Sequence, residues 1–183
     1  NIWHNPGEIG LDGFGRDKRS NLVDDDGDGY IDDWQGWDFG GADFNNPVAD
    51  NDPSPKNLAS GHGTHVAGIA SAATNNMTGI ASIGNKCKLL AVKTGSDNDT
   101  RGSGEPLIAF GFQGIVYAVD RGARVINCSW GGPLASQFEQ DVVNCQYNSG
   151  YENTHFLGTL VYDGVVYDHI EFEIRGEYST YVS

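Results

Sequence analysis

A strand–helix–strand pattern in the middle of the chain constrains the fold more than any other feature. Residues 88–94 and 124–128 are apolar runs that predict two strands. Between them, residues 105–121 place apolar side chains on one helical face, and Gly122 follows where a glycine cap belongs. Strands joined in this way run parallel with a right-handed crossover, and another helix is predicted over 137–147. The pattern predicts an α/β fold, a mainly parallel sheet with helices on both faces.

The two ends of the chain differ from this central part. Turn dipeptides recur throughout residues 1–60, so we expect loop there, and small apolar residues predict a helix over 62–74. Near the C-terminus, alternating apolar residues flank Asp163-Gly164, which predicts an antiparallel hairpin. We therefore expect an α/β domain over 1–149 and a short β-rich, hairpin-containing tail over 150–183.

The acidic residues are concentrated in one stretch. The chain has 25 Asp+Glu against 11 Lys+Arg, a net charge of −14, and ten Asp lie between Asp24 and Asp52 with no Lys or Arg among them. A nucleic-acid-binding protein needs a basic face to displace the counterions of phosphates, so we expect no nucleic-acid partner. No apolar run reaches 18 residues, so we expect no membrane span. A local cluster of carboxylates favours a bound cation instead.

The stretch 24–33 reads DDDGDGYIDD and is similar to the first half of an EF-hand loop. In such loops alternating carboxylates, a glycine and then a backbone carbonyl surround one hard cation. Gln35 stands where a bidentate Glu normally closes the loop, so one of the last two Asp residues must supply that carboxylate. An Asp-Gly turn cluster without an ion is the alternative, but repulsion among so many carboxylates favours calcium. The predicted calcium ligands are Asp24, Asp26, Asp28, Tyr30, Asp32 and Asp33.

Two histidines open the helix predicted at residue 62. His62 and His65 lie in the string GHGTHVAG, whose glycines let a substrate backbone come close. A catalytic imidazole needs a fixed tautomer and an exposed nitrogen. Two capping or core histidines are the alternative interpretation of this string alone.

The histidine string resembles the histidine motif of the subtilisin-like serine peptidases, and other segments match that family in order. These segments are 1–39, 74–80, 89–93, 102–104 and 129–132, so that the resemblance covers about residues 1–147. It implies a calcium-stabilised, secreted serine endopeptidase that acts on protein or peptide substrates. It also implies that His62 is the general base and that His65 is a structural neighbour.

The resemblance further implies a second calcium site and a substrate-binding edge. The second site would consist of the carbonyls of Thr74, Thr78 and Ile80 and the side chain of Asn76, and a polar turn without an ion is the alternative. Two glycine-containing segments would let a peptide add as a β-strand, although they are also typical of ordinary loops. The substrate-binding residues implied are Gly102, Ser103, Gly104, Ser129, Trp130 and Gly131.

Other motifs of the family do not occur in this sequence. The reaction needs a Ser nucleophile, an Asp that orients the histidine and an Asn donor for the oxyanion. The strings Asp-Thr/Ser-Gly, Ala-Gly-Asn and Gly-Thr-Ser-Met-Ala are absent. The chain is then a fragment, an interrupted sequence or an inactive relative, and the change of character after residue 147 favours interruption. We expect an additional chain or segment to carry the missing residues. The alternative function is a catalytically inert, extracellular calcium-binding or assembly module derived from the peptidase fold.

Overall fold

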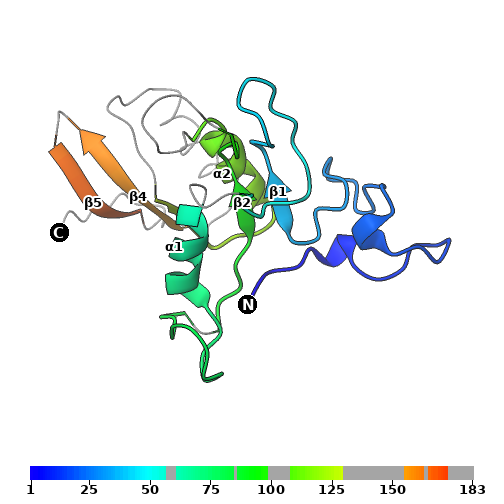
Figure 1. Ribbon diagram of the computed structural model, residues 1–183, viewed down its shortest axis with the longest axis horizontal. Helices are drawn as coiled ribbons and strands as arrows, with labels where there is room; N and C mark the ends of the chain where they lie inside the picture. The colour runs from blue at the N-terminus through cyan, green and yellow to red at the C-terminus, as the bar shows by residue number, and fades with distance from the viewer. Residues whose placement is uncertain (57–60, 85, 99–107, 130–154, 163–164, 173–183) are drawn as a thin grey trace. The chain divides into compact units, whose positions relative to one another are not determined.

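The computed structural model describes residues 1–56, 61–84, 86–98, 108–129, 155–162 and 165–172 (Figure 1). The chain divides into two compact units, Asn1–Phe110 and Gly111–Ser183. Each unit contains strands and one α-helix in its described part. The predicted helix over 137–147 and the boundary predicted at 149/150 lie outside the described residues.

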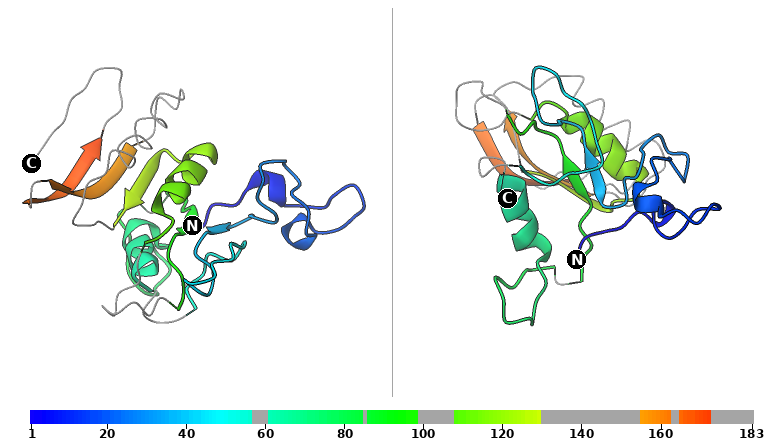
Figure 2. Two further views of the ribbon diagram at one scale, coloured as in Figure 1. Left: turned by 90° about the horizontal axis from the view of Figure 1, so that it is seen from above. Right: turned by 45° about the vertical axis from the view of Figure 1, so that its right-hand side comes forward.

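The first unit begins with a long turn-rich segment, as predicted. Its regular structure consists of two 3-10 helices, η1 (Pro6–Glu8) and η2 (Lys18–Ser20), before the first strand, β1 (Gly36–Asp38). Figure 2 shows this blue part of the chain as mostly loop. Asn5 starts η1 by accepting a hydrogen bond from the Gly7 N–H at 3.0 Å, and Asp17 caps η2 in the same way.

A parallel strand pair forms the sheet of the first unit. β1 pairs with β2 (Ala91–Lys93), and Trp37 lies opposite Val92. Gly36 makes this pairing possible, because it adopts a φ of +122° and a Cβ at this position would lie 1.9 Å from the Ala91 carbonyl oxygen. The strand predicted over 88–94 is thus confirmed in a shorter form, whereas β1 was not predicted.

The helix α1 (His62–Ser71) starts at the predicted residue and ends three residues before the predicted end. Its C-terminal residue, Ser71, is buried, and its hydroxyl lies 3.0 Å from the Gly84 carbonyl oxygen and 2.6 Å from that of Cys87. The Asn1 side chain donates to the Ser71 carbonyl at 3.0 Å. These contacts anchor the C-terminal end of α1 inside the first unit.

The second unit contains α2 (Gly111–Asp120) followed by three strands. Ile115, Tyr117 and Val119 of α2 are buried and form the apolar core together with Ala118 and Ile126. Gly122 ends the helix as predicted, with a φ of +79° and its N–H donating to the Val119 carbonyl at 2.8 Å. The N-terminal part of the predicted helix 105–121 lies partly outside the described residues.

The three strands of the second unit form one mixed sheet in the order β3-β4-β5. β3 (Val125–Cys128) pairs parallel with β4 (His155–Tyr162), and β4 pairs antiparallel with β5 (Val165–Phe172). The predicted C-terminal hairpin is therefore present, and its first strand continues the sheet that β3 begins. The α/β class holds in both units, but β2 and β3, which were predicted as one parallel βαβ unit, lie in different sheets.

No helix within the described ranges combines the length and the apolar character that crossing a membrane would require.

Candidate functional site

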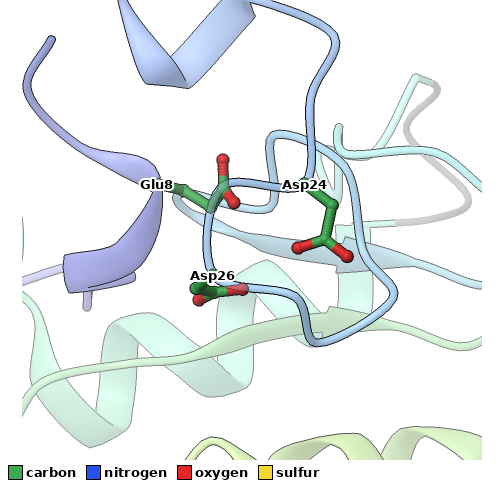
Figure 3. Close-up of side chains that lie close together, drawn as sticks. All are labelled: Glu8, Asp24 and Asp26. Carbon is green, nitrogen blue, oxygen red and sulfur yellow. The ribbon is translucent and has the colours of Figure 1, made fainter. Parts of the chain in front are cut away.

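Three carboxylates from two separate segments meet in the first unit. Oxygen atoms of Glu8, Asp24 and Asp26 lie within 4.8 Å of one another, and Figure 3 shows their side chains around one point. Glu8 comes from η1, whereas the two Asp residues come from the predicted cation loop. Three negative charges at such distances repel one another unless a proton or a cation neutralises them.

Glu8 is the buried member of this acidic cluster. Its side chain is fully buried, and one oxygen accepts a hydrogen bond from the Asp25 N–H at 2.7 Å. The other oxygen, Oε2, is also buried and has no hydrogen-bond partner among the residues that the structure describes. Burial raises the pKa of Glu8, and the neighbouring carboxylates of Asp26, Asp25 and Asp33 add to this increase, while the Asp25 N–H opposes it. A buried carboxylate oxygen normally has a hydrogen-bond donor or a cation as its partner.

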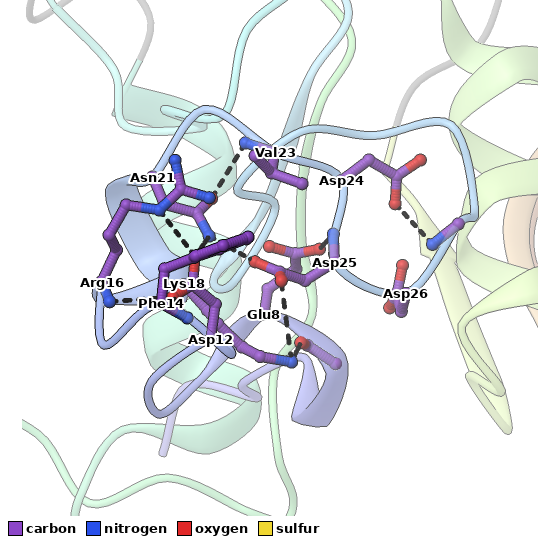
Figure 4. Close-up of polar contacts among 12 residues, drawn as sticks. Glu8, Asp12, Phe14, Arg16, Lys18, Asn21, Val23, Asp24, Asp25 and Asp26 are labelled. Carbon is purple, nitrogen blue, oxygen red and sulfur yellow. Dashed lines mark hydrogen bonds and ion pairs between the residues drawn. The ribbon is translucent and has the colours of Figure 1, made fainter.

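The loop itself folds around Asp24. The Asp24 carboxylate accepts hydrogen bonds from the N–H groups of Gly27 (2.6 Å), Asp28 (3.1 Å) and Gly29 (2.8 Å). Figure 4 shows Asp24 with one of these backbone hydrogen bonds, next to Glu8 and the surrounding polar contacts. Gly27 and Gly29 have φ values of +76° and +94°, so the chain turns sharply at the glycine that the sequence indicated.

The N-terminal segment holds the loop through further contacts. The Asn5 side chain donates to Asp26 Oδ2 at 3.0 Å and to Asp33 Oδ1 at 2.5 Å. Gly7 lies so close to Asp26 that a Cβ there would be 2.3 Å from Asp26 Oδ2. Lys18 donates to the Gly7 carbonyl at 3.1 Å, and its ammonium lies 3.9 Å from Asp25 Oδ1. The loop is therefore packed against η1, and Glu8 is part of that contact.

The other predicted ligands of this loop have different surroundings. Asp28 accepts a hydrogen bond from the Tyr30 N–H at 2.9 Å, and the Tyr30 ring packs edge-on against Trp37. Asp32 and Asp33 are buried, and Asp32 accepts from the Leu22 N–H at 3.2 Å. The structure thus brings Asp24 and Asp26 together with Glu8, while the Asp32 and Asp33 carboxylates bind groups of the surrounding chain. Glu8 was not predicted, because it lies in a different segment and no sequence pattern links it to the loop.

The second predicted calcium segment, 74–80, forms an exposed turn after α1. Asn76 Oδ1 accepts a hydrogen bond from the Thr78 N–H at 3.1 Å, and Asn75 and Met77 have positive φ values of 59° and 55°. The predicted ligands Asn76, Thr78 and Ile80 are exposed, and Thr74 is half-buried. The geometry is that of a tight polar turn with accessible oxygen atoms.

His62 is the first residue of α1, and its side chain is exposed, as is that of His65. Gly61 precedes it without any side-chain hydrogen bond at the helix cap. Within the described ranges, neither histidine forms an ion pair with a carboxylate. The position gives His62 the accessible imidazole that the sequence indicated, at the start of a helix whose other end is anchored.

The predicted substrate-binding residues fall mostly outside the described residues. Gly102, Ser103, Gly104, Trp130 and Gly131 all lie there. Ser129 follows β3 and is exposed, and its Oγ accepts a hydrogen bond from the Asn127 side chain at 2.7 Å.

Comparison with known proteins gives the family. Residues 34–158 match the model of the subtilase family of peptidases. The chain is 44% identical to "Thermitase" of Thermoactinomyces vulgaris over 115 residues, covering 63% of the chain and 36% of that protein. It is 37% identical to "Subtilisin E" of Bacillus subtilis (strain 168) over 111 residues, covering 61% and 26%. It is 42% identical to "Halolysin-like extracellular serine protease Nep" of Natrialba magadii over 82 residues, covering 45% and 14%.

The chain belongs to the subtilase family, as the motifs indicated. It spans little more than a third of Thermitase and less of the other two relatives. The match starts at residue 34, so that His62 lies inside it and the acidic cluster lies before it.

Proposed function

We propose that this chain provides the histidine-bearing part of a secreted, calcium-stabilised serine endopeptidase. The observation that carries this proposal is the family match over 34–158 together with the exposed position of His62 at the start of α1. The name of one relative includes the word extracellular, which supports secretion. The substrates are proteins or peptides.

His62 acts as the general base in this proposal. It takes the proton of a serine hydroxyl during attack on the scissile carbonyl and then returns it to the leaving amine. The serine, the orienting Asp and the oxyanion donor come from an additional segment or chain. Gly102, Ser103, Gly104, Ser129, Trp130 and Gly131 bind the substrate backbone as an added strand. His65 serves the structure of α1.

Calcium stabilises the first unit through the acidic cluster. Glu8, Asp24 and Asp26 offer hard oxygen ligands, and in the described part of the chain the buried Glu8 Oε2 has no hydrogen-bond partner. Calcium fits better than magnesium, because it accepts irregular arrangements of six to eight oxygen atoms, whereas magnesium demands a near-ideal octahedron. Asp28, the Tyr30 carbonyl, Asp32 and Asp33 remain proposed ligands from the same loop. Thr74, Asn76, Thr78 and Ile80 form the proposed second site.

The catalytic assignment is tested by labelling with a fluorophosphonate, which requires an activated serine. This chain alone should neither react with the probe nor hydrolyse a peptide ester above the buffer rate. With the missing residues restored, His62→Ala should lower kcat by several orders of magnitude, whereas His65→Ala should mainly lower stability. Equal losses of kcat in two folded variants would contradict the role of His62. No labelling in the restored protein would favour the inert calcium-binding module.

The calcium assignment is tested separately by isothermal titration of the chain with calcium and with magnesium. Binding of calcium that is lost in Asp24→Asn supports the site. Asp43→Asn is the matched control, because Asp43 is exposed and lies in the same acidic stretch outside the cluster. If calcium produces no heat, or if both variants bind it equally well, the acidic cluster is a solvated loop.

A further inference from the structure

A buried ion cluster lies at the carboxyl ends of β1 and β2. The Lys93 ammonium donates to Asp38 Oδ2 at 2.7 Å and to Asp97 Oδ2 at 2.9 Å. The three side chains are 10%, 2% and 5% exposed, respectively. One ammonium therefore binds two buried carboxylates, and removing it would take away the ion pair that each of them makes with Lys93.

The same groups connect three stretches of the chain. Asp38 accepts hydrogen bonds from the N–H groups of Gly40 (2.8 Å) and Gly41 (2.9 Å). The other oxygen of Asp97, Oδ1, accepts from the Lys56 N–H at 3.1 Å. Ser96 Oγ donates to the Gly40 carbonyl at 2.7 Å. The cluster thus fixes stretch 38–41, the backbone of Lys56 and the segment after β2 at one point.

Two of these stretches lead directly to residues of the proposed site. The chain continues from Lys56 to His62 at the start of α1, and from Asp97 to Gly102–Gly104. The far end of α1 has its own anchor at Ser71, which involves none of the residues of the ion cluster. His62, at the other end of α1, lies six residues after Lys56 in the sequence.

We propose that Lys93 and Asp97 are positioning residues for His62, because together they hold the backbone of Lys56, from which the chain continues to α1. This inference rests on the proposed function. In this proposal neither side chain touches a reacting atom. Lys93 holds the carboxylates of Asp38 and Asp97, and Asp97 in turn holds the backbone N–H of Lys56. An ammonium has three donors, and those of Lys93 reach Asp38, Asp97 and, at 3.4 Å, the Gly41 carbonyl. An uncharged side chain of similar length cannot make these ion pairs, whereas arginine keeps the positive charge and the N–H donors in a group of different shape.

The experiment compares amide hydrogen exchange in the full chain and in its variants, with the histidine resonances recorded by NMR. The variants are Lys93→Met, the milder Asp97→Asn and the rescue variant Lys93→Arg. Lys86→Met is the matched control, because Lys86 is exposed and lies in the same unit. The amides to follow are those of Lys56 and of residues 66–68, the first in α1 that can bond within the helix. The reference amides are those of Ala72 and Gly84 at the anchored end, which donate to Gly68 and Ala70.

We expect exchange at Lys56 and 66–68 to become at least about tenfold faster in Asp97→Asn and Lys93→Met, relative to the Ala72 and Gly84 amides. The His62 resonance should shift, and Lys93→Arg should restore both values. An equal acceleration at all these amides would mean that the cluster only stabilises the unit, and would overturn the proposal. Unchanged exchange would overturn it too. Amide exchange and the His62 resonance can be measured without peptidase activity. Their outcome is therefore independent of the probe labelling that tests the proposed function.

Discussion

Replacing Glu8 by glutamine should change the stability of the first unit differently with and without calcium. Glutamine has nearly the same shape, and its carbonyl can still accept the hydrogen bond from the Asp25 N–H that Glu8 accepts at 2.7 Å. What changes is the charge beside Asp24 and Asp26. Without a cation, removal of one of three carboxylates within 4.8 Å relieves repulsion. The Coulomb energy of one such pair is about 1 kcal/mol at the dielectric constant of water and about 3 kcal/mol at an effective value of 20. Glu8→Gln in EDTA should therefore be as stable as the original chain or more stable.

With calcium the difference in stability should move in favour of the original chain. A ligand that binds only the folded state at a hundredfold excess over Kd stabilises it by about 2.7 kcal/mol. If the loss of the Glu8 carboxylate weakens binding tenfold, the same calcium concentration stabilises Glu8→Gln by only about 1.4 kcal/mol. For a chain of this size, 1 kcal/mol corresponds to about 2–4 °C in Tm. Calcium should thus raise the Tm of the original chain by about 5–10 °C and that of Glu8→Gln by about half as much.

Thermal denaturation followed by circular dichroism, in EDTA and in excess calcium, measures both effects. Asp43→Asn removes the same charge from the acidic stretch and should keep the full response to calcium. The reasoning is refuted if Glu8→Gln lowers Tm equally in EDTA and in calcium, because Glu8 would then act only as an acceptor for Asp25. It is also refuted if calcium does not raise the Tm of the original chain.

Three further predictions concern close contacts and cysteine reactivity. Gly36→Ala should lower the unfolding free energy of the first unit by several kcal/mol, because the added Cβ would lie 1.9 Å from the Ala91 carbonyl oxygen and the φ of this residue is +122°. Chemical denaturation measures this loss, and a value below about 1 kcal/mol would contradict the prediction. Gly7→Ala should weaken calcium binding in a titration, because its Cβ would displace Asp26, and unchanged affinity would show that Asp26 is not a ligand. Iodoacetamide at pH 8 should modify exposed Cys87 in the native chain well before Cys128, as mass spectrometry of the peptides would show, because burial raises the pKa of the Cys128 thiol to about 11.

Sequence patterns were sufficient to predict the helices and strands whose formation depends on their own residues. The apolar period of α2 and the glycine after it predicted the helix and its end, and the Asp163-Gly164 turn predicted the β4–β5 hairpin. β1 was missed, because three residues are too few for a period. Its pairing depends on the close approach of Gly36 to Ala91, which only the folded chain shows.

The candidate site, too, was predicted only in the part that lies within one segment of the chain. The alternating Asp residues indicated a cation loop, and Asp24 and Asp26 do meet. Glu8 joins them from a separate segment, so that its part depends on the tertiary packing of Asp26 against Asn5 and Gly7. Carboxylates such as Asp32 can equally accept hydrogen bonds from the backbone, and a sequence does not distinguish that use from metal binding.

The acidic cluster precedes β1 in the sequence, whereas the buried ion cluster includes the last residue of β1, and a double-mutant cycle can show whether the two clusters act independently. Glu8 contacts Asp25 and the other cluster acids, whereas Lys93 contacts Asp38, Asp97 and Gly41; among the described residues, the two share none of these partners. Sites without shared partners usually contribute additively, within about 0.5 kcal/mol. In calcium, the loss of unfolding free energy in Glu8→Gln combined with Asp97→Asn should therefore equal the sum of the single losses. A coupling energy well above 0.5 kcal/mol would show that the loop and the ion cluster hold the β1–β2 pair through common contacts. Calcium would then influence the placement of His62 as well as the stability of the unit.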